Sequence, residues 1–170
     1  RLVTGAVQDT PVEDGRLAPT TRGGGLRVWV GASTGGHLAE LLELTERSDA
    51  WCPRIDGLIT TLPVGPEVEA TFTRVRLLGD CNRRTWWRAL GIGWRAWRAV
   101  AEARPHLFIT TGSMPMLFVA AAVKARGGRV IWIDSVARVD GLSASAWLAR
   151  WLVDLCLTQW PTVAGRYRQV

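Results

Sequence analysis

The feature that most constrains the fold is a regular alternation of apolar, strand-like runs with helix-like segments, which starts at Leu26 and continues almost to the end of the chain. Strands and helices that alternate in this way are joined by crossover connections, which make neighbouring strands parallel. We therefore predict an α/β fold, with a parallel sheet flanked by helices. The predicted strands are 26–30, 55–62, 73–78, 107–110, 130–133 and 155–158, and the predicted helices are 37–47, 85–103, 114–125 and 144–151.

The chain divides into a short tail and one domain. Residues 1–25 are polar, contain Pro11 and Pro19, end in a run of glycines and show no apolar periodicity, so we predict a flexible or disordered tail there. Residues 26–170 form a single domain. No uncharged apolar run reaches the roughly 18 residues that a bilayer-spanning helix needs. Because the sequence begins at Arg1 rather than Met, an anchor in an upstream segment remains open.

The cysteines and histidines argue against a metal site. Cys52, Cys81 and Cys156 are odd in number and widely spaced, which excludes a disulfide scaffold and a CxxC zinc site. Only two histidines are present, His37 and His106. We therefore predict no metal, and we interpret the cysteines as chemically passive.

The composition points to anionic ligands. Lys124 is the only lysine among 21 Lys and Arg residues, and the formal net charge is +6. Arginine grips phosphate through two parallel hydrogen bonds, and the ten tryptophans favour cores, interfaces and the membrane headgroup layer. Phosphate-bearing or membrane-surface ligands are therefore favoured, although composition alone does not separate these from nucleic acid.

Two glycine-containing loops follow the first and fourth predicted strands. In the common 3-2-1-4-5 strand order these strands are neighbours, and ligands bind at their carboxyl ends, where the strand order reverses. Glycine lets a ligand approach the backbone, and the N–H groups of a helix N-terminus bind anions. A tight turn that binds nothing is the alternative for each loop. The residues that we predict to cradle a phosphate are Ser33, Thr34, Gly35 and Gly36 in the first loop, and Thr111, Gly112 and Ser113 in the second.

Three polar residues near these loops are candidates for chemistry. His37 stands in the first helical turn, where the helix dipole disfavours the imidazolium cation, so it suits a general base or a phosphate donor. Asp134 and Arg138 follow the fifth strand and could contact a polar ligand. Packing or capping is the alternative for His37, and an ordinary solvated loop is the alternative for the other two.

The predicted helix 85–103 has an unusual aromatic stripe. At 100° per residue, Leu90 and four tryptophans fall within an arc of about 100°, and arginines occupy the adjoining arc. This pattern is typical of a helix that lies on a membrane surface. The alternative, and the commoner use of such a stripe, is packing of the tryptophans on the sheet. The predicted membrane-surface residues are Trp86, Trp87, Arg88, Trp94, Arg95 and Trp97, with Arg84 and Arg98 beside them.

Several segments, taken in order, resemble a known family. The loop 30–37, with its Gly-Gly-His, is similar to the first loop in the acceptor half of two-domain GT-B glycosyltransferases. The wider pattern resembles the separate acceptor subunit of split enzymes, such as the eukaryotic subunit that helps to add the second GlcNAc to dolichol-linked oligosaccharide, and bacterial exopolysaccharide homologues. The other segments that carry the resemblance are 104–112, 131–138, 142–143 and 154–161.

The resemblance implies a fold and a function. The fold would be a Rossmann-like domain, equivalent to the N-terminal half of a GT-B glycosyltransferase. The chain would bind a polyprenyl-diphosphate sugar at the two glycine loops, with His37 and Asp134 as catalytic residues, and would be inactive without a separate catalytic subunit. It would bind no cofactor itself, because the partner would supply the UDP-sugar. The expected location is the cytoplasmic face of the membrane, with no nucleic-acid partner.

Two other functions remain open from the sequence alone. One is a complete small α/β enzyme that uses His37 and Asp134 on a phosphorylated metabolite. The other is an arginine-rich module that binds nucleic acid or a membrane surface without catalysis.

Overall fold

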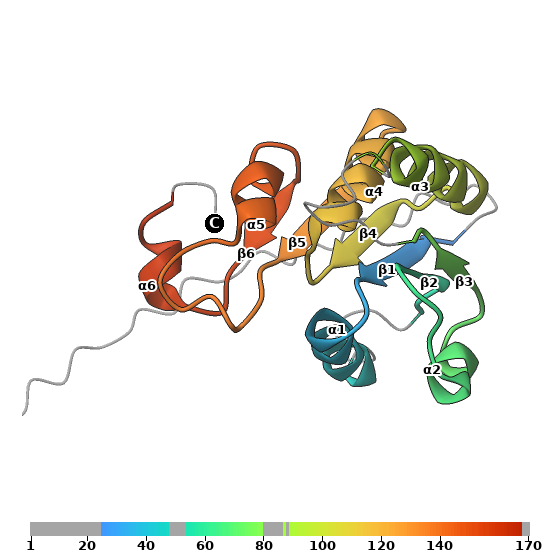
Figure 1. Cartoon of the computed structure of the whole chain (residues 1–170), viewed down its shortest axis with the longest axis horizontal. Coiled ribbons are helices and arrows are strands. Elements are labelled where there is room, and N and C mark those ends of the chain that lie inside the picture. The colour runs from blue at the N-terminus through green and yellow to red at the C-terminus, as the bar shows by residue number, and fades with distance from the viewer. Residues whose placement is uncertain (1–24, 48–53, 80–86, 88, 168–170) are drawn as a thin grey trace, which may run out of the picture.

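The computed structural model describes residues 25–47, 54–79, 87 and 89–167. The strands of this part of the chain form one sheet in the order β3-β2-β1-β4-β5-β6, and all neighbouring pairs are parallel (Figure 1). The predicted parallel α/β fold is therefore confirmed, and the first and fourth strands are neighbours as expected. The strands are β1 (Val28–Ala32), β2 (Gly57–Thr60), β3 (Val75–Leu77), β4 (Leu107–Thr110), β5 (Arg129–Ile133) and β6 (Leu155–Leu157).

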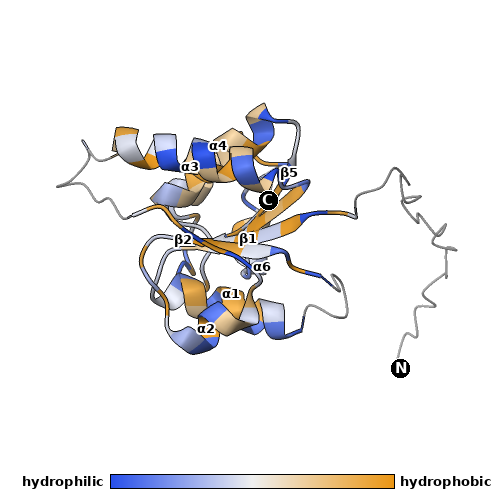
Figure 2. Cartoon of the chain, turned by 90° about the vertical axis from the view of Figure 1, so that its right-hand side faces the viewer, coloured by the Kyte–Doolittle hydropathy of each residue, from blue (hydrophilic) through white to orange (hydrophobic). Residues whose placement is uncertain are grey.

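Helices cover both faces of the sheet. The helices α1 (Gly36–Glu46) and α2 (Pro66–Thr71) lie on one face, whereas α3 (Ala89–Ala103), α4 (Met114–Ala125) and α5 (Ala144–Ala149) lie on the other (Figures 1 and 2). The short helix α6 (Pro161–Ala164) follows β6. None of the described helices combines the length and the apolar composition that crossing a membrane would require.

The sequence prediction missed α2 and α6. Both are short, and each carries its proline in the first helical turn. Proline has no N–H and a fixed φ, which suits the first helical position as well as a turn, so the residue alone does not separate the two.

The sheet is buried by an apolar layer on each side. Trp29, Phe108 and Trp132 are fully buried beneath α3, α4 and α5, and Val30 and Leu41 belong to the smaller layer beneath α1 and α2. β1 continues through Gly31 to Ala32, two residues beyond its predicted end. Packing requires glycine at position 31, because a Cβ at Gly31 would lie 2.5 Å from the Phe108 ring.

The helix α3 turns its tryptophans outward. Its buried residues are small or aliphatic, namely Ile92, Ala96, Ala99, Val100 and Ala103. Leu90 and Trp94 are 86% and 64% exposed, and Trp87 and Trp97 are exposed as well. The interpretation that these tryptophans pack on the sheet is therefore wrong. The alanines let α3 pack closely on the sheet and on α4, which leaves the bulky side chains for the outer face.

Several predictions fall on residues that the structure does not describe. These are the tail up to residue 24 and the individual residues Cys52, Cys81, Arg84, Trp86 and Arg88. The predicted helix 85–103 is described from Ala89 onward.

Candidate functional site

The two glycine loops meet at the carboxyl edge of the sheet. The strands β1 and β4 pair in parallel, with Gly31 opposite Thr110, so the loops that follow them leave the sheet side by side. A hydrogen bond joins the loops directly, because Oγ1 of the buried Thr111 donates to the main-chain carbonyl of His37 at 2.6 Å. The structure therefore brings together the two loops that the sequence predicts as one phosphate cradle.

The first loop leaves the N-terminus of α1 open. Gly35 is the N-cap residue at φ +95°, a conformation that side chains disfavour, and no side chain caps the helix. A Cβ at Gly35 or Gly36 would meet nothing within 4 Å, so a ligand can approach the backbone there. The main-chain N–H groups of Gly36 and His37 begin the helix, where the dipole favours an anion.

The second loop holds two consecutive residues at positive φ. Gly112 has φ +102°, and Ser113, a non-glycine residue, has φ +101°. Ser113 is the N-cap residue of α4, but it makes no capping hydrogen bond. Its Oγ is buried and has no hydrogen-bond partner among the described residues. A strained serine with an unused hydroxyl is typical of a ligand-binding position.

Unpartnered polar atoms concentrate at this edge. Buried polar groups are nearly always hydrogen-bonded, so a cluster of exceptions marks a place where a ligand or water supplies the bonds. Five of the six such side-chain atoms in the described part of the chain belong to residues at or near the carboxyl ends of the strands; Arg150 Nε is the sixth. The five are His37 Nδ1, Glu40 Oε2, Thr60 Oγ1, Ser113 Oγ and Trp132 Nε1.

Glu40 is a site residue that the sequence reasoning missed. It follows His37 by three residues on α1, so both side chains lie on one face of the helix. Its Oε1 accepts a hydrogen bond from Ser135 Oγ at 2.9 Å, and its Oε2 has no partner among the described residues. The i, i+3 spacing from His37 was the signal in the sequence. Glu40 links α1 to the loop that follows β5.

A threonine after β2 also supports the first loop. Oγ1 of the buried Thr61 accepts a hydrogen bond from the main-chain N–H of Thr34 at 3.2 Å. The Thr34 hydroxyl lies 3.4 Å from the same oxygen. No motif singled out Thr61, because its role depends on the pairing of β1 with β2 rather than on local sequence.

Asp134 lies deep in the loop that follows β5. It is 2% exposed, and its Oδ2 accepts the main-chain N–H of Ser143 at 2.8 Å. Ser143 in turn caps α5 through its hydroxyl. The carboxylate therefore holds both ends of the 134–143 loop together. Arg138 is exposed within that loop, with its main-chain N–H bonded to the carbonyl of Ser135.

Cys156 has the inert character expected from the sequence. Burial, followed by the negative charge of Asp134, raises the pKa of its thiol from 9.0 to about 11, and the positive charge of Arg150 opposes this only in part. A thiol with such a pKa is not a nucleophile near neutral pH.

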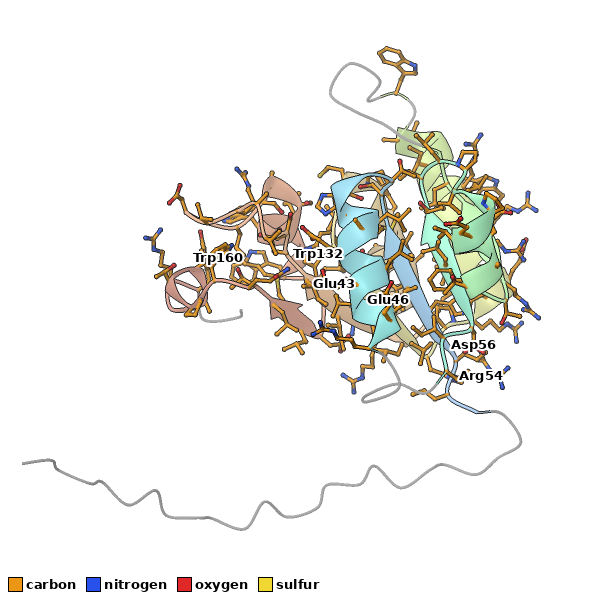
Figure 3. The ribbon with its side chains drawn as sticks, turned by 90° about the horizontal axis from the view of Figure 1, so that it is seen from below. Glu43, Glu46, Arg54, Asp56, Trp132 and Trp160 are labelled. Atoms are coloured by element: carbon orange, nitrogen blue, oxygen red, sulfur yellow. The ribbon has the colours of Figure 1, made fainter. Side chains whose placement is uncertain are left out.

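A groove of about 690 Å³ extends from this edge beneath the sheet. It lies between α1 and the ends of β5 and β6, on the face that Figure 3 shows, where Glu43 is labelled on α1 and Trp160 on the opposite side. The Trp160 indole donates to the carbonyl of Val136 at 2.8 Å and so fixes the outer wall. The residues that line the groove are Glu40, Glu43, Leu44, Arg47, Ile133, Val136, Leu157, Thr158 and Gln159.

The arrangement can bind an anion and move a proton. Two uncapped helix N-termini converge on one place, a buried serine hydroxyl can donate there, and a half-buried imidazole stands beside them with an unused nitrogen. This is the composition of a site for a phosphate ester that carries a reactive hydroxyl.

The fold is similar to part of a GT-B glycosyltransferase. The chain superimposes on the crystal structure of Acinetobacter baumannii MurG with a TM-score of 0.63 over 81% of its length, at 12% identity. The match covers 43% of the MurG chain, so this chain spans less than half of that enzyme's length. This confirms the predicted fold class.

The sequence belongs to the family of oligosaccharide biosynthesis proteins like Alg14, whose family model matches residues 67–170. Consistently, 87 residues are 36% identical to the UDP-N-acetylglucosamine transferase subunit ALG14 of Eremothecium gossypii. That match covers 44% of this chain and 39% of the relative, so the alignment spans well under half of the relative's length. The resemblance expected from the sequence is therefore confirmed at the level of the family.

Proposed function

We propose that this chain is the acceptor-binding subunit of a two-component glycosyltransferase. Its substrate would be a sugar linked to a polyprenyl lipid through a diphosphate. The observation that carries the proposal is the convergence of the two open loops, joined by the bond from Thr111 to the His37 carbonyl, around a group of unpartnered polar atoms. Membership of the Alg14-like family supports the same class of activity.

The diphosphate would occupy the cradle between the helix N-termini. Gly35 and Gly36 leave the backbone of the first loop open, and Ser113 offers a hydroxyl from the second. The donors are the main-chain N–H groups of Gly36 and His37 and the Ser113 hydroxyl. Together with the two helix dipoles, they would stabilise the two negative charges of the diphosphate. Thr34 and Thr111 would hold the loops in position, since both already bond to protein groups.

His37 would act on the acceptor sugar. Its Nδ1 is buried and unpartnered among the described residues, so this nitrogen can receive the proton of the sugar hydroxyl or, when protonated, donate to the diphosphate. Glu40 would position the loop after β5 through Ser135. Asp134 would shape that loop rather than touch the sugar, because its carboxylate is buried and bonded to Ser143.

The donor sugar would come from a partner. The relative ALG14 is named as a subunit of a UDP-N-acetylglucosamine transferase, and the MurG match covers less than half of that enzyme. We infer that this chain meets a second subunit that binds the UDP-sugar, and that it holds no cofactor of its own.

The acceptor lipid would stay in the membrane, so the subunit would work at the membrane surface, on its cytoplasmic side. The exposed stripe of Leu90, Trp94 and Trp97 on α3 supports a surface contact. Tryptophan side chains favour the headgroup layer of a membrane.

The test is reconstitution with the partner. Tagged chain is used to capture the second subunit from the native host, and transfer from UDP-N-acetylglucosamine to a polyprenyl-diphosphate sugar is measured with each subunit alone and with both. We expect turnover only from the mixture. Robust transfer by this chain alone would contradict the proposal. So would an unchanged rate of transfer when the mixture contains the His37→Ala variant.

A further inference from the structure

A hollow lined by arginines lies at the opposite, amino edge of the sheet. It has a volume of about 460 Å³ and opens between the start of β1 and the C-terminal ends of α3 and α4. Asp56, labelled in Figure 3, marks the same edge, because its carboxylate accepts the main-chain N–H of Val28. The lining residues are Arg27, Val100, Arg104, Pro105, His106, Arg126, Gly127 and Gly128.

The hollow contains cations and no carboxylate. Arg27, Arg104 and Arg126 line it together with His106, and none of the three arginines forms an ion pair with a described residue. Neighbouring cations behave differently. Lys124 and Arg129 both pair with Asp154, and Arg76 and Arg98 both pair with Glu102. Carboxylates are thus present nearby, but they do not serve the hollow.

Two of the three guanidinium groups make contacts within the protein. Arg27 donates from Nε to the carbonyl of Arg104 at 2.7 Å. Arg126 lies over the ring of Trp97, with its guanidinium carbon 5.3 Å from the ring centre. Arg104 has φ +46°, an uncommon conformation for a residue other than glycine.

The contacts between His106 and Arg27 bring two hydrogen-bond donors together without an acceptor between them. The main-chain N–H of Arg27 donates to Nδ1 at 3.1 Å, and the Arg27 guanidinium lies 3.0 Å from Nε2. A neutral imidazole has one acceptor nitrogen, and its other nitrogen carries a hydrogen. In either tautomer, therefore, one N–H group of Arg27 faces the N–H group of the imidazole, and both are donors. An oxygen of a bound anion would satisfy both donors.

We propose that this hollow binds a phosphate group, through Arg27, Arg104, Arg126 and His106. Phosphate matches the in-plane donors of arginine, and three cations outweigh the partial negative charge of the two helix C-termini. The phosphate could belong to a soluble compound or to the headgroup of an anionic phospholipid. The contact of Arg126 with the exposed Trp97 joins the hollow to the α3 stripe, so both sources share one chemistry here.

Amide NMR of the full chain, titrated with inorganic pyrophosphate, tests the site, because it reports the two edges of the sheet separately. We expect saturable shifts at His106, Gly127 and Gly128. The double variant Arg104→Gln/Arg126→Gln should raise the apparent Kd at these amides by about tenfold or more. The control Arg74→Gln/Arg166→Gln removes two charges outside the hollow and should leave the Kd unchanged. The single variant Arg126→Gln serves if the double variant does not fold.

Sedimentation with vesicles separates the two sources. Mixed phosphatidylcholine and phosphatidylglycerol vesicles are compared with vesicles of phosphatidylcholine alone. A loss of anionic-vesicle binding in Arg104→Gln/Arg126→Gln and not in the control assigns the site to a lipid headgroup, whereas a loss confined to pyrophosphate assigns it to a soluble phosphate compound. Equal binding of both ligands by the variant, the control and the wild type overturns the proposal. Shifts at Gly35, Gly36 and Gly112 report the acceptor cradle, so failure of one site leaves the other testable.

Discussion

Thr111 donates its hydroxyl to the main-chain carbonyl of His37 at 2.6 Å, across 74 residues of sequence. The bond joins the second residue of α1 to the loop between β4 and α4. A helix end and a loop, which belong to different crossover units, are thereby fixed relative to each other. In the proposed function this one bond sets the width of the diphosphate cradle.

Replacing Thr111 with valine should therefore affect both stability and acceptor binding. Valine keeps the shape but leaves the buried carbonyl of His37 without this donor, which we expect to lower the free energy of unfolding by about 1–3 kcal/mol. The KM for the acceptor should rise, because the loops are no longer held at one spacing. Urea unfolding and steady-state kinetics of the reconstituted enzyme measure the two effects. Thr71→Val is the control, since Thr71 makes the same kind of bond within exposed α2.

His37→Ala should lower turnover by roughly a hundredfold or more if the imidazole is the general base. Thermal unfolding should hardly change, since no described side chain bonds to the imidazole Nδ1. His37→Gln distinguishes the two proposed roles. Glutamine can donate to the diphosphate but cannot take a proton, so a restored KM with a low kcat indicates a base. Unchanged kcat and KM in His37→Ala would return His37 to a packing role.

Ser113→Gly should change stability and binding in opposite directions. Ser113 has φ +101°, and glycine adopts that conformation without strain, so we expect the free energy of unfolding to rise by about 1 kcal/mol. The hydroxyl that we assign to the diphosphate is lost, so acceptor affinity should fall. Ser113→Ala loses the same hydroxyl but keeps the strain. It should match glycine in affinity and not in stability, and equal acceptor affinity of all three proteins would contradict the assignment.

Much of the fold was predictable because it depends on local pattern. The elements β4 and α4 have the predicted bounds, since apolar runs closed by glycine or proline define them. The outward face of α3 was not predictable from its periodicity. A helix with tryptophans on one side and alanines on the other has two apolar faces, and only the close approach of α4 decides in favour of the alanines.

The candidate site was predictable in its location more than in its detail. Strand order placed both glycine loops at one edge, and the structure confirms that they meet. The residues that support those loops could not be predicted from the sequence. Thr61 and Glu40 make their contacts only because of strand pairing and helix packing. The bond between the Asp134 carboxylate and the main-chain N–H of Ser143 was not predictable either, because the two residues are nine positions apart and no local motif joins them.

Asp154 should make stability depend on pH in the acid range. Burial acts to raise its pKa, but hydrogen bonds from Lys124, Arg129 and the main chain of Val130 outweigh burial and lower the pKa from 3.8 to about 2. The carboxylate therefore stabilises the fold above about pH 4, and this contribution is lost as the pH falls toward about 2. Asp154→Asn should cost about 2 kcal/mol near neutral pH and progressively less in acid. Urea unfolding of both proteins across this range measures the difference, and a difference that does not shrink in acid would exclude this origin.

The exposed stripe on α3 should decide where the protein docks. Leu90→Ser/Trp94→Ser removes two side chains that are 86% and 64% exposed, so stability should hardly change. Binding to anionic vesicles should weaken by about tenfold or more, because each buried apolar side chain contributes on the order of 1.5–3 kcal/mol. The control Leu148→Ser/Trp151→Ser changes the same residue types on α5 and just after its end, where both are also exposed, and should bind vesicles normally. If the α3 variant keeps its vesicle binding and loses the catalytic partner instead, the stripe is a protein interface, and another surface must hold the subunit near its lipid acceptor.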